Sequence, residues 1–126
     1  MNSVIISVGS NIDPEQNIAK MLTILEKDFR VLKVSELVRT KPIGIEDQPD
    51  FVNGAALVET ELSQDDFKGF LKSVEDKLGR DRSLPKFGPR TMDLDIVVWN
   101  GEIVDEDYYT RDFLRDAVES LGFKNG

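Results

Sequence analysis

Asp93 and Asp95 stand two residues apart in a largely apolar segment. Alternate residues of a strand face the same side, so their Cα atoms are expected roughly 6.6 Å apart with both carboxylates together. The chain has no histidine and no cysteine, so any metal ligands must be oxygen atoms, which favours magnesium, calcium or manganese. A magnesium pair held by carboxylates is a common clamp for phosphoryl transfer. The structural alternative is that both aspartates simply face solvent.

A basic stretch precedes the acidic pair. Residues 79–90 contain one acid, Asp81, and four cations: Arg80, Arg82, Lys86 and Arg90. In a chain with a formal net charge of −8, a local basic stretch suggests a small polyanion as ligand. Carboxylates for a metal beside arginines for phosphate are what a metal–polyphosphate complex requires. An ordinary solvated loop is the alternative for the basic stretch alone.

Two further sets of residues have weaker chemical signals. Phe51 and Asn53 share one face of a predicted strand, where an aromatic ring and an amide could recognise a flat heterocycle; a core Phe and an edge Asn are the alternative. Gly9-Ser10-Asn11 lies between a strand and a helix. It lacks the lysine and the full pattern of a phosphate-binding loop, which favours a tight turn.

Alternating strands and helices must position these residues. Hydrophobic periodicity predicts strands at 1–8, 31–39, 51–61 and 91–99, a helix at 14–29, and a second helix between Ser63 and Gly79. Asp13 with Gln16 is expected to cap the first helix, Ser63 the second, and Asn100-Gly101 indicates a turn. The order β-α-β-β-α-β predicts an α+β, ferredoxin-like fold: an antiparallel sheet with two helices on one face, plus a short, partly helical C-terminal tail.

Length and composition indicate one globular domain over residues 1–126. The acidic balance argues against a nucleic-acid or anionic-membrane surface. The N-terminus is not typical of a signal peptide, and no segment approaches the ~20 apolar residues of a membrane span. We therefore expect a cytoplasmic protein, a monomer or weak dimer, whose partners are small molecules.

The run from Gly88 to Ile96, GPRTMDLDI, resembles the signature of the 6-hydroxymethyl-7,8-dihydropterin pyrophosphokinase family of folate biosynthesis. Further matches follow in the expected order: Gly9-Ser10-Asn11, Arg39-Thr40 with Pro42, the run from Asp47 to Asn53, and Glu75 with Gly79-Arg80. The resemblance covers roughly residues 4–100. It implies the ferredoxin-like fold and transfer of pyrophosphate from ATP to the hydroxymethyl group of the pterin, with release of AMP.

The resemblance also implies roles for individual residues. Asp93 and Asp95 would bind two magnesium ions and, with Arg82 and Arg90, form the catalytic set. The ATP site would comprise Glu75, Arg80, Arg82, Arg90, Ile96 and Arg111. The pterin site would comprise Thr40, Pro42, Ile43, Gly44, Phe51, Asn53, Asp93 and Phe113. The loop from residue 80 to residue 90 would close over the substrates.

This sequence departs from the family pattern at several points. Phe87 stands where the family usually has tryptophan, and Phe51 where it often has tyrosine. The family's late histidine-containing loop has no counterpart, which leads us to expect a shortened C-terminal region whose Arg111 and Phe113 replace the family's late Arg and Phe. The leading hypothesis is an active, magnesium-dependent diphosphokinase. The alternatives are a catalytically impaired paralogue that binds nucleotide or pterin, and a ferredoxin-like regulatory module for a small ligand.

Overall fold

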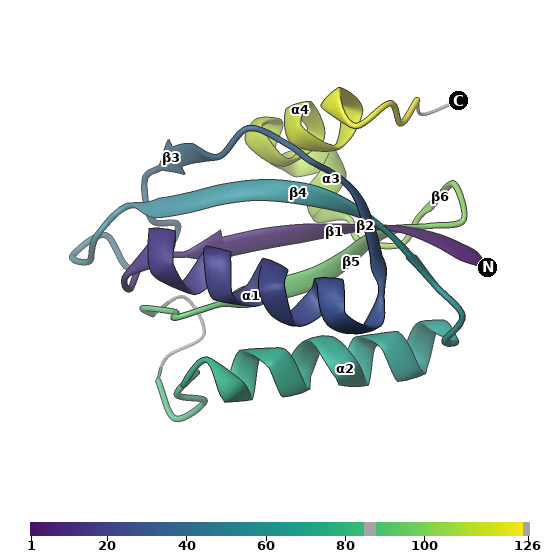
Figure 1. Cartoon of the computed structure of the whole chain (residues 1–126). Helices are drawn as coiled ribbons and strands as arrows, with labels where there is room; N and C mark the ends of the chain where they lie inside the picture. Colours follow the sequence, from purple (N-terminus) through teal and green to yellow (C-terminus); the bar gives the residue numbers. More distant parts are fainter. Residues whose placement is uncertain (85–87, 125–126) are drawn as a thin grey trace.

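An antiparallel sheet lies at the centre of this computed structural model, which describes residues 1–84 and 88–124 (Figure 1). Its strands are β1 (Asn2–Ser10), β2 (Arg30–Val34), β3 (Val38–Thr40), β4 (Phe51–Thr60), β5 (Asp93–Trp99) and β6 (Glu102–Ile103). The order across the sheet is β2-β4-β1-β5-β6, and β3 pairs with the start of β4. The predicted α+β class and antiparallel sheet are confirmed. Phe87, a predicted departure from the family pattern, lies outside the described residues.

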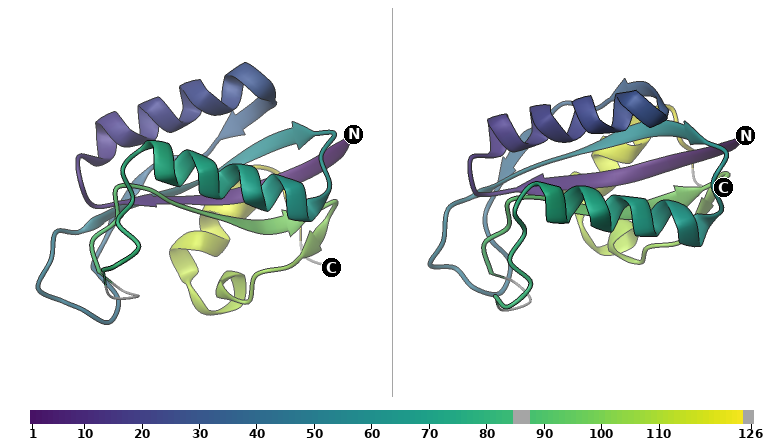
Figure 2. Two further views of the ribbon diagram at one scale, coloured as in Figure 1. Left: turned by 90° about the horizontal axis from the view of Figure 1, so that it is seen from below. Right: turned by 60° about the horizontal axis from the view of Figure 1, so that its bottom comes forward.

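Helices α1 (Pro14–Asp28) and α2 (Gln64–Lys77) cover one face of the sheet, as both views of Figure 2 show. Their apolar faces meet residues from β1, β4 and β5 in one core. The ring of Phe29, just after α1, packs edge-on against Phe67 and Phe70 of α2, with centroids 5.2 and 4.7 Å apart. This burial fixes the first half of α2 against α1. Val74 and Leu78, near the other end of α2, pack into the same core and hold that end beside the sheet.

The opposite face of the sheet is partly covered by the C-terminal helices α3 (Asp107–Thr110) and α4 (Asp112–Ser120). Leu114, Val118 and Leu121 pack with Tyr108 against the sheet in a second core. The helical tail expected from the apolar spacing is therefore confirmed. The short elements β6 and α3 were not predicted, because two to four residues carry too little periodicity to be recognised.

Helix capping follows the prediction at only one of the two helices. The Ser63 hydroxyl accepts a hydrogen bond from the Asp66 N–H and caps α2. Asp13 instead adopts the left-handed region at a φ of 42° and makes no side-chain cap, so the capping box expected with Gln16 is wrong. Buried Asn17 supports this turn, because its side-chain amide donates to the Ile12 carbonyl at 2.7 Å.

The single strand predicted over residues 31–39 is divided between β2 and β3. At Ser35 the backbone N–H donates to the Ala55 carbonyl, while the side-chain hydroxyl accepts from the Ala55 N–H, both at 2.8 Å. The serine side chain thus replaces a backbone partner and the chain bends away from β4. By contrast, the predicted turn after β5 is confirmed, since Asn100 and Gly101 both have positive φ.

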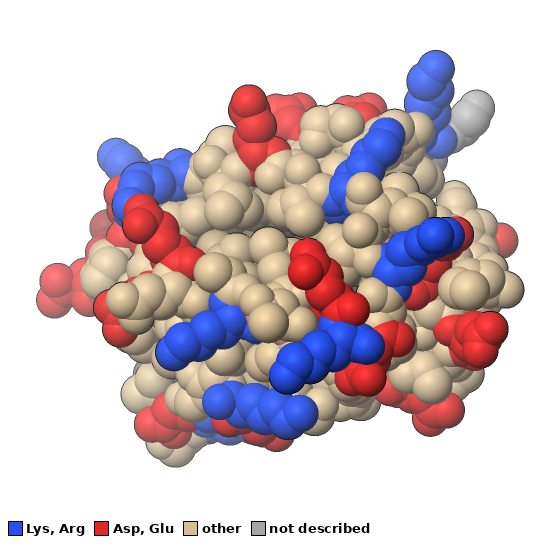
Figure 3. Space-filling view, in the orientation of Figure 1, with Lys and Arg blue, Asp and Glu red and all other residues tan. Residues whose placement is uncertain are grey.

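Acidic and basic side chains are interspersed over the molecular face that α1 and α2 cover, as Figure 3 shows. Among residues 1–84 and 88–124, no helix combines the length and the apolar character that crossing a membrane requires. The cytoplasmic location and the oligomeric state stay predictions.

We expect Met21→Ala to lower the free energy of unfolding by about 2–5 kcal/mol, because the fully buried Met21 side chain fills the core between α1 and the sheet. Chemical denaturation measures this loss. The matched control is Lys20→Ala at the neighbouring exposed position, which should change stability by less than about 0.5 kcal/mol. Equal effects of the two substitutions would contradict the packing described here.

Candidate active site

The acidic pair lies at the start of β5, beside the centre of the sheet. Asp93 is opposite Gly9 and Asp95 is opposite Ser7 in the pairing with β1. Between them, Leu94 is buried in the core under the helices, as the alternation along the strand predicted. Both aspartates line two neighbouring cavities, one at the edge of β5 facing α2 and the other against β4. The acidic pair therefore belongs to both.

Glu75 is the buried anchor of the first cavity. Only 3% of the Glu75 surface is exposed. Its carboxylate nevertheless accepts hydrogen bonds at both oxygens. One oxygen accepts from the Leu94 backbone N–H at 2.8 Å and from Arg80 at 2.7 Å, and the other accepts from Arg82 at 3.1 Å. The carboxylate thus ties the end of α2 to the edge of β5 and orients both arginines.

The arginines divide between the carboxylates. Arg80 Nη1 lies 3.2 Å from Asp93 Oδ1 while it also contacts Glu75. Arg90 Nη1 lies 4.0 Å from the same Asp93 oxygen. Arg82 pairs with Glu75 and with Asp76, and its side chain is much more exposed than that of Arg80. Of the basic residues predicted to surround a polyphosphate, Arg80 and Arg90 therefore lie at Asp93 and Arg82 lies beside Glu75. Lys86 lies outside the described residues.

Asp95 has no ion pair among the described residues, and its electrostatic surroundings are unfavourable for a charge. Desolvation first, and then the carboxylates of Asp93, Asp105 and Glu75, raise the pKa of Asp95 to about 7. The Asp95 side chain also keeps exposed surface, so solvent screening reduces the effect of this charge on stability. Burial likewise raises the pKa of Glu75, against the opposing effects of the Leu94 N–H and the two arginines.

The carboxylate oxygens of Asp93 and Asp95 are ligands that suit magnesium. Within residues 1–84 and 88–124, no cluster of three or more candidate ligand side chains forms a closed metal cage. Two carboxylates at an open cavity suit an ion that keeps water and takes phosphate oxygens as its remaining ligands. The excess negative charge around Asp95 favours a cation there. Asp93 and Asp95 are the residues that would hold it.

The first cavity, of about 340 Å³, runs between α2 and the edge of β5. Glu75, Arg80, Arg82 and Ile96, all predicted for ATP, line it. Sequence reasoning missed the α2 residues farther along the same wall, which are Gln64, Lys68, Leu71 and Lys72, and the loop residues Val104 and Asp105. The spacing of four between Gln64, Lys68 and Lys72 was the available signal, because it places their side chains on one helix face.

The second cavity, of about 350 Å³, brings together most of the residues predicted for the pterin. Its lining includes Thr40, Ile43, Phe51, Asn53, Asp93 and Phe113. Pro42 and Gly44 lie in the same loop but outside this lining. The side-chain amide of Asn53 donates to the Thr40 hydroxyl. Gly9 faces them closely, since an added Cβ would lie 2.9 Å from Asn53 Oδ1.

Two arginines predicted for ATP, Arg90 and Arg111, line the second cavity and not the first. Arg111 is paired with Asp107 at 3.7 Å, and Asp107 also lines the second cavity. Arg80 lines both cavities. The tail residues Arg111 and Phe113 thus reach the site, as expected, although they approach from the side of the second cavity.

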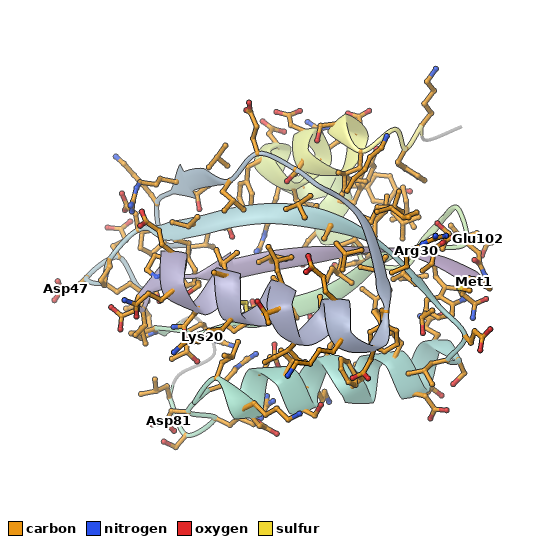
Figure 4. The ribbon with its side chains drawn as sticks, in the orientation of Figure 1. Met1, Lys20, Arg30, Asp47, Asp81 and Glu102 are labelled. Atoms are coloured by element: carbon orange, nitrogen blue, oxygen red, sulfur yellow. The ribbon has the colours of Figure 1, made fainter. Side chains whose placement is uncertain are left out.

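Asn11 joins the loops that frame the site. Its side-chain Nδ2 donates to Gln48 Oε1 at 2.9 Å and to the Pro49 carbonyl at 3.0 Å, and its side-chain Oδ1 accepts from the Arg90 N–H at 2.8 Å. The Asn11 backbone N–H donates to the Arg90 carbonyl at 3.0 Å. In Figure 4, Asp47 and Asp81 mark these two loops at the end of the molecule opposite Met1 and Glu102. Gly9 and Ser10 continue β1, so the tight turn predicted at Gly9-Ser10-Asn11 begins only at Asn11. Asn11 has a structural role, because it links both loops.

The sheet, the acidic pair and the arginines define an α+β protein with a carboxylate–arginine site. Residues 5–121 match the model of the 7,8-dihydro-6-hydroxymethylpterin-pyrophosphokinase (HPPK) family. The chain belongs to this family, and the resemblance carried by the residue 88–96 signature is confirmed.

Individual relatives agree with the family match. The chain is 38% identical over 105 residues to a 2-amino-4-hydroxy-6-hydroxymethyldihydropteridine pyrophosphokinase of Pseudomonas aeruginosa, covering 81% of this chain and 64% of that protein. Proteins of the same description from Haemophilus influenzae and Bacillus subtilis are 34% and 36% identical over 113 and 107 residues. These matches cover 87% and 82% of this chain, and 70% and 64% of the relatives. The chain thus spans about two thirds of the length of these relatives.

Asp95→Asn should stabilise the ligand-free protein at high pH. The pKa of Asp95 is about 7 in the fold against an ordinary 3.8, so the native state binds more protons and stability falls as pH rises from about 4 to 7. The neutral amide removes that penalty. Allowing for solvent screening, we expect a gain of about 1 kcal/mol at pH 8 and none near pH 4. Denaturation at both pH values measures it, and lower stability of the variant at pH 8 would refute the raised pKa.

Asn11→Ala should loosen both loops while the sheet stays intact, because it removes three side-chain hydrogen bonds. We expect faster amide hydrogen exchange at residues 45–50 and 88–91 and a stability loss of about 1–3 kcal/mol. Asn17→Ala is the matched control, since Asn17 is also buried but bonds only within its own turn. Equal hydrogen-exchange rates of the two loops in Asn11→Ala and Asn17→Ala would contradict this role of Asn11.

Proposed function

We propose that this protein transfers the pyrophosphoryl group of ATP to the hydroxymethyl oxygen of 6-hydroxymethyl-7,8-dihydropterin and releases AMP, a step of folate biosynthesis. The observation that carries the proposal is the position of Asp93 and Asp95 between two cavities. One cavity holds the arginines suited to a triphosphate, and the other holds aromatic and amide groups suited to a flat heterocycle. The relatives from Pseudomonas aeruginosa and Haemophilus influenzae are described as pyrophosphokinases of a hydroxymethyldihydropteridine, which supports the proposal.

Asp93 and Asp95 would hold two magnesium ions. Magnesium bound there would supply positive charge against the triphosphate and draw electron density from the attacked phosphorus. Arg80, Arg82 and Arg90 would balance the remaining phosphate charge by charge-assisted hydrogen bonds. Positioning and charge neutralisation are sufficient for phosphoryl transfer, so a histidine base is not required.

In the second cavity, Phe51 and Phe113 offer ring faces for stacking, and Asn53 offers an amide to the edge of the heterocycle. The amide of Asn53 is oriented by Thr40, which limits the ways in which a planar ligand can pair with it. We also propose that the fold is ferredoxin-like. The strand order β2-β4-β1-β5, with α1 and α2 on one face of the sheet, supports this topology.

A paralogue that binds nucleotide or pterin with impaired turnover is the second candidate. It is favoured by the absence of any histidine from the sequence and by the pairing of Asp93 with Arg80. In that case both cavities would bind their ligands, but no AMP would form.

The test is AMP formation from ATP, magnesium and the hydroxymethyl dihydropterin, followed by phosphorus NMR. We expect AMP and a pterin diphosphate, and a fall in turnover of at least about 100-fold in Asp93→Ala and in Asp95→Ala with the fold retained. Asp116→Ala, an exposed carboxylate on α4, is the matched control and should keep full activity. If the unmodified protein forms no AMP but binds its ligands in calorimetry, the protein is the binding paralogue and not the enzyme.

A further inference from the structure

Arg80 occupies the place of a cation at Asp93. A single nitrogen, Nη1, lies 2.7 Å from Glu75 Oε2 and 3.2 Å from Asp93 Oδ1. The Arg80 side chain is only 14% exposed, so this bridge is sheltered from solvent. Arg90 is within 4.0 Å of the same Asp93 oxygen. The charge of Asp93 is therefore already compensated within the protein, whereas Asp95 has no ion pair among the described residues.

This arrangement opposes the binding of a divalent cation by itself. A free cation at Asp93 would have to displace the Arg80 guanidinium or lie within a few ångströms of it. Two like charges at such distances repel strongly in a partly buried site. Displacement alone would leave the guanidinium with only one of its two carboxylate partners. Losing an ion-pair partner in a site sheltered from solvent is unfavourable.

A cation that arrives bound to a polyphosphate is not repelled in the same way, because the phosphate brings a new partner for Arg80. The phosphate oxygens can replace Asp93 as the partner of Arg80, because a guanidinium forms charge-assisted hydrogen bonds with phosphate as it does with carboxylate. Glu75 can keep its own contact with Arg80 during this exchange, since Arg80 lines both cavities from its anchored position. The exchange frees the Asp93 oxygen for the metal and conserves the number of ion pairs.

We infer that Arg80 makes metal binding at the acidic pair conditional on a polyphosphate: it stands in for the metal at Asp93 in the ligand-free protein and moves to phosphate when both arrive together. The inference rests on the proposed function for the identity of the ligand. Its consequence is a positive coupling between metal and nucleotide. Before any nucleotide binds, Arg80 thus keeps the acidic pair from filling with free cations.

The test measures binding and needs neither pterin nor turnover. Manganese serves as the probe, and its free concentration is followed by electron paramagnetic resonance without nucleotide. We expect weak binding to the unmodified protein and about tenfold tighter binding to Arg80→Gln, within the usual range of coupling between sites. The glutamine amide retains a donor for Glu75. Arg82→Gln is the matched control, because Arg82 contacts Glu75 and Asp76 but forms no described ion pair with Asp93, and it should bind manganese like the unmodified protein.

A second variant separates charge from shape. Arg80→Lys keeps the positive charge and should bind manganese as weakly as the unmodified protein. Unchanged or weaker manganese binding by folded Arg80→Gln, or equal gains in Arg80→Gln and Arg82→Gln, would overturn the inference. Should Arg80→Gln fail to fold, tight manganese binding by the unmodified protein without nucleotide would overturn it equally. Failure of AMP formation would count against the proposed function alone, because the manganese comparison is made without substrates.

Discussion

The buried carboxylate of Glu75 is the interaction on which the site depends. It receives the Leu94 N–H from the edge of β5 and the guanidinium groups of Arg80 and Arg82 from the chain that follows α2. A buried carboxylate is costly unless such donors satisfy it. The cost is offset only when α2, β5 and the basic loop are all in place, so this one group makes the geometry of three segments interdependent.

The fold supplies that geometry from two sides. Packing of α1 and α2 on one face holds the end of α2 beside β5. Packing of α4 on the other face brings Arg111 and Phe113 to the second cavity. The acidic pair lies where these surfaces meet, and Asn11 joins the two loops nearby. The opposing charges at the site are thereby held in place by packing before any ligand arrives, which is the preorganisation that phosphoryl transfer requires.

Much of this arrangement follows from the sequence because its signals are local. The alternation of Asp93, Leu94 and Asp95 fixed which side chains face the core, and the apolar spacing of α1 and α2 identified both helices. Other features depend on contacts distant in the chain. The division of the strand after Val34 arises from Ser35 bonding to Ala55, and the role of Asn11 arises from residues 37 to 79 positions away. Sequence periodicity carries no record of such partners.

The measurement that tests the account most directly is a crystal structure with manganese and a non-hydrolysable ATP analogue, read by anomalous scattering. We expect manganese at Asp93 and Asp95, the triphosphate in the cavity lined by α2 and β5, and Arg80 paired with phosphate while it keeps its contact with Glu75. Manganese bound elsewhere, or Arg80 still paired with Asp93 beside a bound nucleotide, would contradict it.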